Sequence, residues 1–247
     1  MSKKVFKIAI NGNKGGIGKT ATVMGLADSL RRMGEKCILI DWDKQRNLTK
    51  LIEGANSAQT GIADLLMGKP TDTYMVDDHI ELVAGSPNIN TSEFANLRHD
   101  TISIELGDTE QHIIVDLNPT ITYSVTQSMF LCDTFLIMLI GDRPAFEGAM
   151  ELAVELNNWN IKSKKKENAI RYAFVHNSYR KCANSRTIDE AIQKLHPTIP
   201  LFHVSHRVII DQARHSKLFI SQANGDAESK KLILGEYDAI TNWILGG

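Results

Sequence analysis

The chain has 247 residues, of which 43% are hydrophobic, and this is enough to bury a sheet with helices on both faces. Its 28 basic and 29 acidic residues almost balance, so composition alone does not indicate a nucleic-acid-binding protein, and such affinity would need a local patch. The three cysteines lie far apart without a C-x-x-C spacing, which indicates reduced thiols in the cytosol rather than a disulfide framework or a zinc site. No apolar run approaches the roughly 20 residues that a membrane span needs, and no signal peptide is visible before the first predicted strand.

The first elements expected along the chain are a strand, a glycine-rich turn and a helix. Residues 5–10 alternate as a strand does, and the glycine-rich segment 12–18 follows at once. After Thr20, apolar residues recur at helical spacing, and two arginines followed by Gly34 mark the end of that helix. Residues 37–40 are wholly apolar, which is typical of a parallel strand covered on both faces.

The rest of the chain continues this alternation of strands and helices. Further strands are predicted over residues 80–84, 113–115, 135–140, 172–175 and 200–204, and helices over residues 147–156, 187–195 and 227–245. The alternation predicts an α/β fold with a doubly wound, mostly parallel sheet flanked by helices. No repeat or interdomain linker interrupts it, so residues 1–247 are expected to form a single domain.

The glycine-rich turn has the features of a phosphate-binding loop. Residues 13–20 read Asn-Lys-Gly-Gly-Ile-Gly-Lys-Thr, between a predicted strand and a predicted helix. Glycines let the backbone curl so that successive N–H groups point at phosphate oxygens, and the helix N-terminus adds its partial positive charge. We expect Lys19 to reach the β- and γ-phosphates of a nucleotide and the Thr20 hydroxyl to bind Mg²⁺.

This loop departs from the standard pattern G-x-x-x-x-G-K-[ST] at its start. Asn13 stands where that pattern has glycine, and Lys14 is an additional cation. Lys14 is either a surface residue of a flexible loop or a group that acts on phosphates. Its position is too close in sequence to curl back onto its own nucleotide, so in the second case it would serve a neighbouring subunit, as an arginine finger does.

Three motifs together resemble the ParA/MinD family of ATPases, and the resemblance extends along nearly the whole chain. The family's loop reads K-G-G-x-G-K-[ST], its second motif D-x-D-P-Q-G-N and its third an apolar strand ending D-x-P-P. This chain has the loop at residues 14–20, Asp-Trp-Asp-Lys-Gln-Arg-Asn at 41–47, and Asp-Leu-Asn-Pro at 116–119. Gly148 matches a family glycine, and the pairs at 186–187 and 206–207 resemble the family's partition branch.

The resemblance implies roles for individual residues. Lys14 would act across a homodimer on the partner's phosphates, Asp43 would position or activate the attacking water, and Asp116 would hold the Mg²⁺ shell through water. The residues implied for catalysis are Lys14, Lys19, Asp43 and Asp116; those implied for Mg²⁺ are Thr20, Asp43 and Asp116; and those implied for ATP are Gly15, Gly16, Ile17, Gly18, Lys19, Thr20, Ala21 and Asn177. Asp43 has the alternative role of capping the turn after its strand, and Asp116 that of an N-cap at the end of its strand.

The chain also departs from the family pattern beside these residues. Lys44 and Arg46 replace a proline and a glycine and add two positive charges near Asp43, while Asn118 replaces the first proline of the third motif. None of these changes removes a group that the chemistry requires.

The partition branch implies non-specific DNA binding by an ATP-bound dimer, with hydrolysis stimulated by an adaptor of ParB type. Such a protein is cytoplasmic, is nucleoid-associated when ATP-bound, and segregates a plasmid or chromosome or positions another large cargo. The alternative for its basic residues is scattered solubilising charge. The candidates for the DNA contact are Arg180, Lys181, Arg186, Arg207, Arg214 and Lys217, with His215 and residues 164–166 as possible additions.

Three other functions compete with this one. A MinD-like positioning ATPase would carry a basic amphipathic C-terminal helix, whereas residues 232–245 include acidic residues and are expected to pack on the sheet. An iron–sulfur reductase would need a cysteine pair, and Cys132 has no evident partner. A scaffold that binds nucleotide without hydrolysing it stays open.

Overall fold

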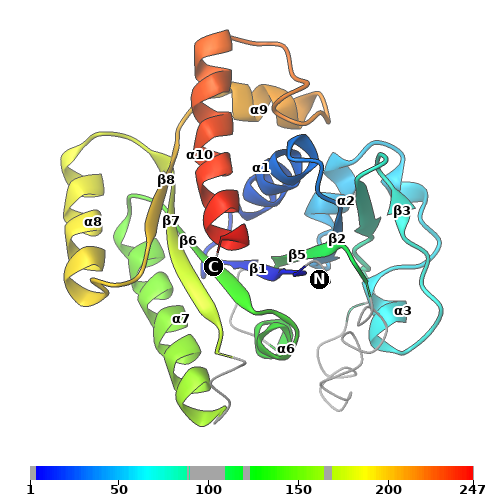
Figure 1. Ribbon diagram of the computed structural model, residues 1–247, viewed down its shortest axis with the longest axis horizontal. Helices are drawn as coiled ribbons and strands as arrows, with labels where there is room; N and C mark the ends of the chain where they lie inside the picture. The colour runs from blue at the N-terminus through cyan, green and yellow to red at the C-terminus, as the bar shows by residue number, and fades with distance from the viewer. Residues whose placement is uncertain (1–3, 88, 90–108, 119–122, 164–168, 247) are drawn as a thin grey trace.

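The computed structural model describes residues 4–87, 89, 109–118, 123–163 and 169–246. Figure 1 shows strands and helices alternating through most of this part of the chain. In chain order the elements are β1 (Lys7–Asn11), α1 (Lys19–Arg32), β2 (Cys37–Trp42), α2 (Asn47–Leu51), η1 (Ala55–Ser57), α3 (Ile62–Leu66), β3 (Tyr74–Met75), β4 (Ile80–Val83), β5 (His112–Leu117), α6 (Tyr123–Leu131), β6 (Thr134–Leu139), α7 (Arg143–Lys162), β7 (Arg171–Tyr179), α8 (Ala183–Leu195), β8 (Leu201–Ser205), α9 (Val208–His215) and α10 (Ala227–Leu245).

The strands form one sheet in the order β3-β4-β2-β5-β1-β6-β7-β8. Every pair in it is parallel except β3 with β4, which is antiparallel at the edge. The first strand, β1, lies in the interior of the sheet between β5 and β6, and further strands extend the sheet on both sides of it. The predicted doubly wound, mostly parallel fold is confirmed.

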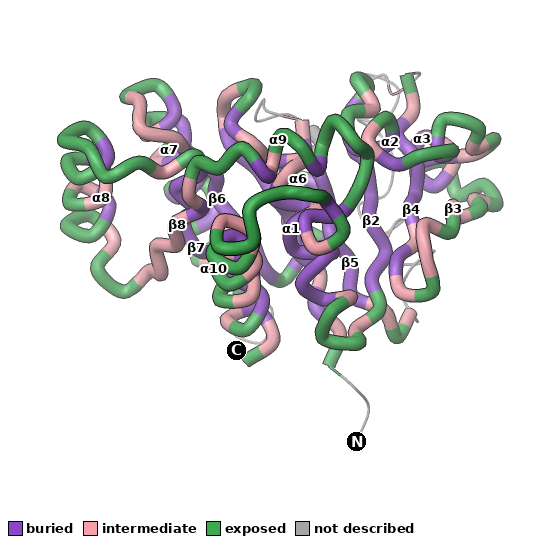
Figure 2. Tube along the Cα trace, turned by 90° about the horizontal axis from the view of Figure 1, so that it is seen from above, coloured by how far each residue is buried: buried purple, intermediate pink, exposed green. Residues whose placement is uncertain are grey.

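Two hydrophobic cores cover the two faces of the sheet. One contains buried side chains of α1, α2, α9 and α10, and the other contains buried side chains of α3, α6, α7 and α8. Successive strand residues enter opposite cores, as with Ile8 and Ala9 of β1, because side chains alternate across a strand. Figure 2 shows this buried interior along the strands, with exposed segments on the outer helices and loops.

The C-terminal helix α10 is part of the fold rather than a free amphipathic segment. Ile233, Tyr237, Ile240 and Ile244 are all buried against the core that also contains α1. This confirms that the segment packs on the sheet. Among the described residues, no helix combines the length and apolar character needed to cross a bilayer.

Cys37 and Cys132 are buried in the two cores, as small apolar residues would be. The elements that the sequence patterns did not indicate are short: α2, η1, α3, β3, α6 and α9. The helix over 227–245 matches its predicted bounds. Helix α7 begins four residues before and ends six residues after the predicted range 147–156, because Asp142 caps its N-terminus and Pro144 lies in its first turn, where proline is tolerated.

Two helix glycines give opposite expectations for the same substitution. A β-carbon on Gly25 of α1 would lie 2.4 Å from the Tyr237 ring of α10, whereas one on Gly235 would meet nothing within 4 Å. Gly235→Ala should raise the free energy of unfolding by about 0.5 to 1 kcal/mol through helix propensity alone. Gly25→Ala should lower it by about 1 to 3 kcal/mol because the two helices must separate. Urea unfolding of both variants checks this, and a stabilised Gly25→Ala protein would contradict the packing.

Candidate nucleotide and metal site

The loop between β1 and α1 has the backbone geometry of an anion cradle. Gly16 and Gly18 have φ angles of 77° and 89°, in the left-handed region that favours glycine. Helix α1 begins at Lys19 without a side-chain cap and without an acidic residue in its first turn. Its first N–H groups are therefore available to a bound anion, which the helix dipole also favours.

A cavity of about 730 Å³ opens at this loop, at the carboxyl ends of β2 and β5. It brings together most of the residues predicted for the site. Its lining contains Gly15, Gly16, Gly18, Lys19, Thr20, Ala21, Asp43 and Asp116 from the predicted set, with Lys44, Gln45, Asn47, Lys50, Leu51, Leu117, Asn118 and Arg214 in addition. Ile17, Lys14 and Asn177 do not line it.

Lys19 is held by the loop itself. The side-chain ammonium donates to the carbonyl oxygens of Lys14 at 3.1 Å and Gly12 at 3.4 Å. Burial lowers the pKa of Lys19, while the nearby carboxylates of Asp116 and Asp43 act to raise it. The ammonium is thereby positioned at the base of the cradle, where a phosphate would replace part of its lost hydration.

Three carboxylates lie close to this lysine at the ends of β2 and β5. Asp41 and Asp116 are register partners across the two strands and are both almost fully buried. Burial and the neighbouring Asp41 raise the pKa of Asp116 to about 7, against the opposing effects of Thr20 and Lys19. Burial likewise raises the pKa of Asp41 to about 6, although its carboxylate accepts hydrogen bonds from the Thr49 N–H and hydroxyl at 2.8 and 2.7 Å.

Asp43, the third carboxylate, has the capping role considered for it, and its role toward the attacking water stays a prediction. Its Oδ1 accepts a hydrogen bond from the Gln45 N–H at 2.9 Å, so it does cap the turn after β2. It also lines the cavity. The capping bond involves one carboxylate oxygen and leaves the other for a ligand.

The donor set fits a magnesium ion. Asp116 shares a hydrogen bond with the Thr20 hydroxyl, and Asp43 faces the same cavity, so carboxylate and hydroxyl oxygens converge there. Oxygen ligands of this kind, together with phosphate and water, are what Mg²⁺ takes in nucleotide sites. Burial is the main cause of the raised pKa of Asp116; the neighbouring carboxylates of Asp41 and Asp43 add to it, while Thr20 and the Lys19 ammonium oppose it.

Two predicted residues contact the loop from outside the cavity. Asn177 of β7 donates its side-chain amide to the Ile17 carbonyl at 2.8 Å, and a β-carbon on Gly18 would lie 2.0 Å from that amide. Asn177 therefore braces the loop in this structure, and its predicted contact with ATP stays a prediction. Gly148 of α7 is similarly close, since a β-carbon there would lie 2.4 Å from the Asn13 side chain.

Lys14 lies at the rim of the site and is paired within its own chain. Its ammonium contacts the carboxylate of Asp142 at 2.5 Å, and the two side chains are 41% and 35% exposed. Asp142 is also the N-cap of α7, where its other oxygen accepts from the Ala145 N–H. Burial would raise the pKa of Asp142, but these bonds from Lys14 and Ala145 outweigh it and lower the pKa.

The residues that depart from the family pattern have identifiable places. Lys44 and Asn118 line the cavity, and Arg46 adopts the left-handed conformation with φ 55°. Glycine takes that conformation without strain, which explains the glycine of the family motif at this position. Arg46 also helps to hold the pKa of Asp41 down. Pro119 lies outside the described residues.

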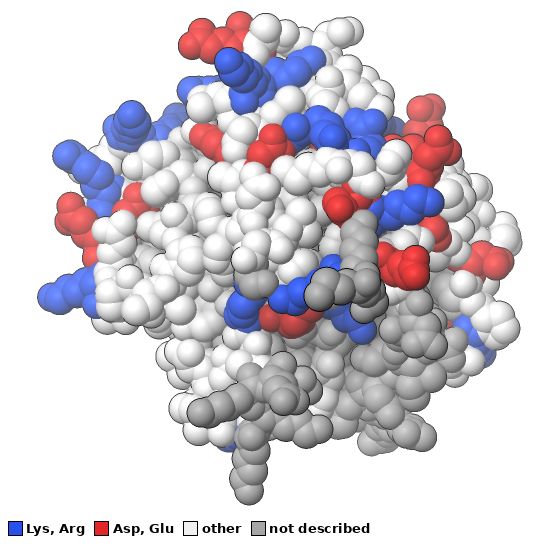
Figure 3. Space-filling model, in the orientation of Figure 1, with Lys and Arg blue, Asp and Glu red and all other residues white. Residues whose placement is uncertain are grey.

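The basic residues predicted for DNA divide into two groups. Arg180, Lys181, Arg186 and Arg207 are exposed around the ends of β7 and β8. Figure 3 shows basic side chains over the upper part of the molecule as seen in that view, interspersed with acidic ones. Residues 164–166 lie outside the part of the chain that the structure describes.

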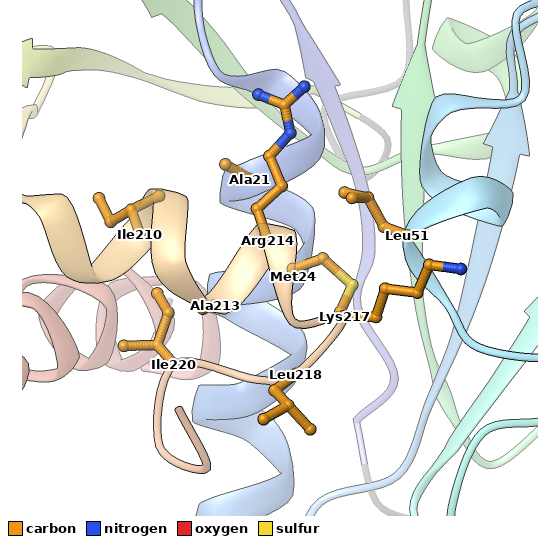
Figure 4. A pocket seen from close by; sticks show the side chains of 9 residues that line it. All are labelled: Ala21, Met24, Leu51, Ile210, Ala213, Arg214, Lys217, Leu218 and Ile220. Carbon is orange, nitrogen blue, oxygen red and sulfur yellow. The ribbon is translucent and has the colours of Figure 1, made fainter. Parts of the chain in front are cut away.

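Arg214 and Lys217 form the second group, at the border of the nucleotide cavity. Both line a small pocket with room for about 30 Å³, beside Ala21 of α1 and Leu51 of α2, and Arg214 lines the large cavity as well. Figure 4 shows the two side chains extending from α9 and the turn after it, alongside α1. Sequence reasoning missed Arg214 and Lys50 as residues of this cavity, because α9 is far from the loop along the chain and neither residue belongs to a motif.

Comparison with known proteins supports this picture. The family model described as AAA domain (AAA_31) matches residues 5–170. The chromosome-partitioning ATPase Soj of Thermus thermophilus is 26% identical over 156 residues, which cover 62% of this chain and 62% of that protein. The chain thus matches about three fifths of that relative's length.

Solved structures show the same fold along nearly the whole chain. The ATP complex of a single-residue variant of McdA from Cyanothece superposes with a TM-score of 0.82 at 14% identity and covers 99% of this chain and 97% of that one. The cell division ATPase MinD of Pyrococcus furiosus does so with a TM-score of 0.76 at 16% identity, covering 98% and 100%.

The charge at Asp116 predicts an unusual pH dependence of stability. Because the pKa of this carboxyl is raised from 3.8 to about 7, the folded protein holds the proton more tightly than the unfolded chain does. The stability that the protonated Asp116 carboxyl contributes is therefore complete below about pH 4 and is lost as the pH rises through about 7. In Mg²⁺-free buffer at pH 8, Asp116→Asn should raise the free energy of unfolding by on the order of 1 kcal/mol or more.

Thermal unfolding of the wild type and the Asp116→Asn variant at pH 5 and pH 8 checks this expectation. The advantage of the variant should shrink at pH 5, and Mg²⁺ with ADP should stabilise the wild type more than the variant at pH 8. A variant less stable than the wild type at pH 8 without Mg²⁺ would contradict the account of this carboxylate.

Proposed function

This chain belongs to the AAA-domain family AAA_31 and to the ParA/MinD type of ATPase, and from that premise we propose that it is a partition or positioning ATPase. In this proposal it hydrolyses ATP with Mg²⁺, forms a homodimer in its ATP state and binds DNA non-specifically as that dimer. An adaptor of ParB type would stimulate hydrolysis and select the cargo. DNA release would follow each hydrolysis, so the nucleotide would set how long the protein stays on DNA.

One observation carries the catalytic part of the proposal. Lys19, Thr20, Asp43 and Asp116 come from three separate segments and line the same cavity at the carboxyl ends of parallel strands. Lys19 and the N–H groups of the loop would hold the phosphates, Thr20 and Asp116 would hold the metal, and Asp43 would orient the attacking water. Mg²⁺, when bound, neutralises charge on the β- and γ-phosphate oxygens.

The position of Lys14 supports a role toward a second subunit. Its side chain is half-exposed at the rim of the loop and does not line the cavity of its own chain. To reach a partner's phosphates it must leave Asp142. An exposed ion pair of this kind contributes about 0 to 1 kcal/mol, so ATP-bound dimers would break it at little cost.

The DNA part of the proposal rests on the exposed basic residues near α8 and α9. If one monomer meets about three phosphates and a dimer about six, the logarithm of affinity falls with the logarithm of salt concentration about twice as steeply for the dimer. Dimerisation then converts negligible affinity into useful affinity. Arg214 lies both on α9 and on the nucleotide cavity, so α9 is the element through which nucleotide and DNA would influence each other.

Removing the Lys14 cation tests the cross-subunit mechanism. Lys14→Gln should lower steady-state ATP turnover, measured with DNA and adaptor present, by about 10³-fold, because charge developing on the transferred phosphate loses its partner. Nucleotide binding by the monomer should remain near normal. Turnover close to that of the wild type would refute this role.

Asp142→Asn is the matched control for that experiment. Asparagine caps a helix as well as aspartate does, so α7 keeps its first hydrogen bond while Lys14 loses its ion pair. This variant should keep its turnover and dimerise at equal or lower protein concentration, as measured by light scattering with a non-hydrolysable ATP analogue.

DNA binding in three nucleotide states tests the second half of the proposal. Retention on random-sequence DNA should be strong with ATP and weak with ADP or no nucleotide at about 50 mM salt, and should fall steeply by about 200 mM. Arg207→Glu should lower affinity by about tenfold while leaving ATP binding intact. Lys36→Glu is the control, because Lys36 is exposed before β2, at the amino-terminal side of the parallel strands. An equal loss of DNA affinity in the Arg207→Glu and Lys36→Glu variants would overturn the DNA-binding part of the proposal. Equal retention of the wild type on DNA in all three nucleotide states would do so as well.

A further inference from the structure

A cluster of metal-ligating side chains lies outside the nucleotide site, between β7, β8 and α8. His176 of β7 and His203 of β8 are register partners in the parallel sheet, so their imidazoles stand side by side on the same face. The ring centroids lie 6.0 Å apart. This placement follows from strand pairing and does not depend on the flexible ends of long side chains.

Helix α8 places one carboxylate between the two rings. Asp189 Oδ1 lies 2.7 Å from Nδ1 of His176, and Oδ2 lies 2.9 Å from Nε2 of His203. One possible ligand atom from each of the three residues lies within 4.8 Å of the other two. Among the described residues, this is the group of histidine, cysteine and acidic side chains that converges in this way.

A β-bulge closes the cluster on one side. From His176 to Tyr179 the chain advances three residues, while the paired strand advances two, from His203 to Ser205. In a regular strand the third residue points to the opposite face, but the extra residue and the left-handed Ser178, with φ 50°, turn Tyr179 back. Its ring centroid lies 5.1 Å from that of His176 and 4.2 Å from that of His203.

The surroundings determine which atoms face a ligand. His176 is completely buried, and its Nε2 lies beside Gly141, 3.6 Å from the place of a β-carbon there. Nδ1 is therefore the nitrogen that faces Asp189. The His203 side chain is 37% exposed and that of Asp189 13%, so solvent reaches the cluster mainly at His203.

We propose that His176, Asp189 and His203 form a binding site for a divalent transition-metal ion, with Zn²⁺ as its representative. Two imidazole nitrogens and one carboxylate are the donor types that Zn²⁺ takes, and a water on the exposed side of His203 completes four ligands. Mg²⁺ prefers oxygen ligands throughout, which separates this site chemically from the nucleotide site.

A bound ion would join three elements of the C-terminal third of the chain. The ion would take the place of the hydrogen bonds between Asp189 and the two histidines, and it would bind one ligand each from β7, β8 and α8. An ion that binds only the folded protein raises its stability in proportion to the logarithm of its concentration above Kd. The bulge at Ser178, which strains a non-glycine residue, is of the kind that persists where a local geometry has a use.

The test is a Zn²⁺ titration of tag-free protein by calorimetry, in the presence of excess Mg²⁺ so that the nucleotide site does not contribute. The wild type should bind one equivalent per chain, and its melting temperature should rise with Zn²⁺. Co²⁺ in place of Zn²⁺ should give the visible absorption of a four-coordinate site with nitrogen and oxygen ligands.

Matched variants assign the binding to this cluster. His203→Gln and Asp189→Asn should each weaken Zn²⁺ binding by at least about tenfold, since even indirect support of a metal ligand has effects of that size. His206→Gln changes an exposed histidine three residues away and should bind as the wild type does. Cys182→Ser should also leave the binding unchanged, which excludes the exposed thiol.

Two results would overturn the proposal. One is the lack of stoichiometric binding by the wild type, which would make the cluster a hydrogen-bonded group in which Asp189 only orients two imidazoles. The other is equal Zn²⁺ binding by the wild type and His203→Gln, with the melting temperature of each variant showing that it is folded.

Discussion

The nucleotide site depends on a repulsion that the fold itself imposes. Parallel pairing of β2 with β5 puts Asp41 directly beside Asp116, and the turn after β2 adds Asp43. In a buried setting these charges are costly, which is why the pKa of Asp116 is raised to about 7 and that of Asp41 to about 6. Hydrogen bonds from Thr49 and Thr20 and the Lys19 ammonium offset part of that cost. A divalent cation bound with a nucleotide would offset the rest, so part of the affinity for such ligands would come from relief of this electrostatic repulsion.

The long, regular features of this architecture were predictable from the residues. Wholly apolar runs such as residues 37–40 indicate parallel strands, because such strands are covered on both faces. The glycine-rich turn before Lys19 indicates the phosphate loop, because its backbone conformation requires glycines at fixed positions. Helices α2 and α3, with 5 residues each, and strand β3, with 2, are too short to show a periodicity. They are positioned by their contacts with β2 and β4, which no local pattern records.

Within the site, residues that belong to motifs could be predicted, whereas contacts between residues far apart along the chain could not. Lys19, Thr20, Asp43 and Asp116 follow from motifs, and the cavity does contain them. The contact of Asn177 with the Ile17 carbonyl joins residues 160 positions apart, and Arg214 reaches the cavity from α9. Such contacts are decided by how helices pack on the sheet. The left-handed backbone of Arg46 differs from these contacts, since the glycine of the family motif at that position is a sign of it while the arginine itself is not.

The brace from Asn177 has a consequence for dissecting the protein into parts. The region shared with the AAA-domain family ends at residue 170, seven positions before the amide that supports the loop and well before α10, which covers α1. A truncated chain ending at 170 would therefore lose the bond to Ile17 and uncover the apolar side of α1, including Gly25, where Tyr237 packs. Such a fragment would carry every residue of the phosphate motif and would still be expected to aggregate and to hold nucleotide poorly.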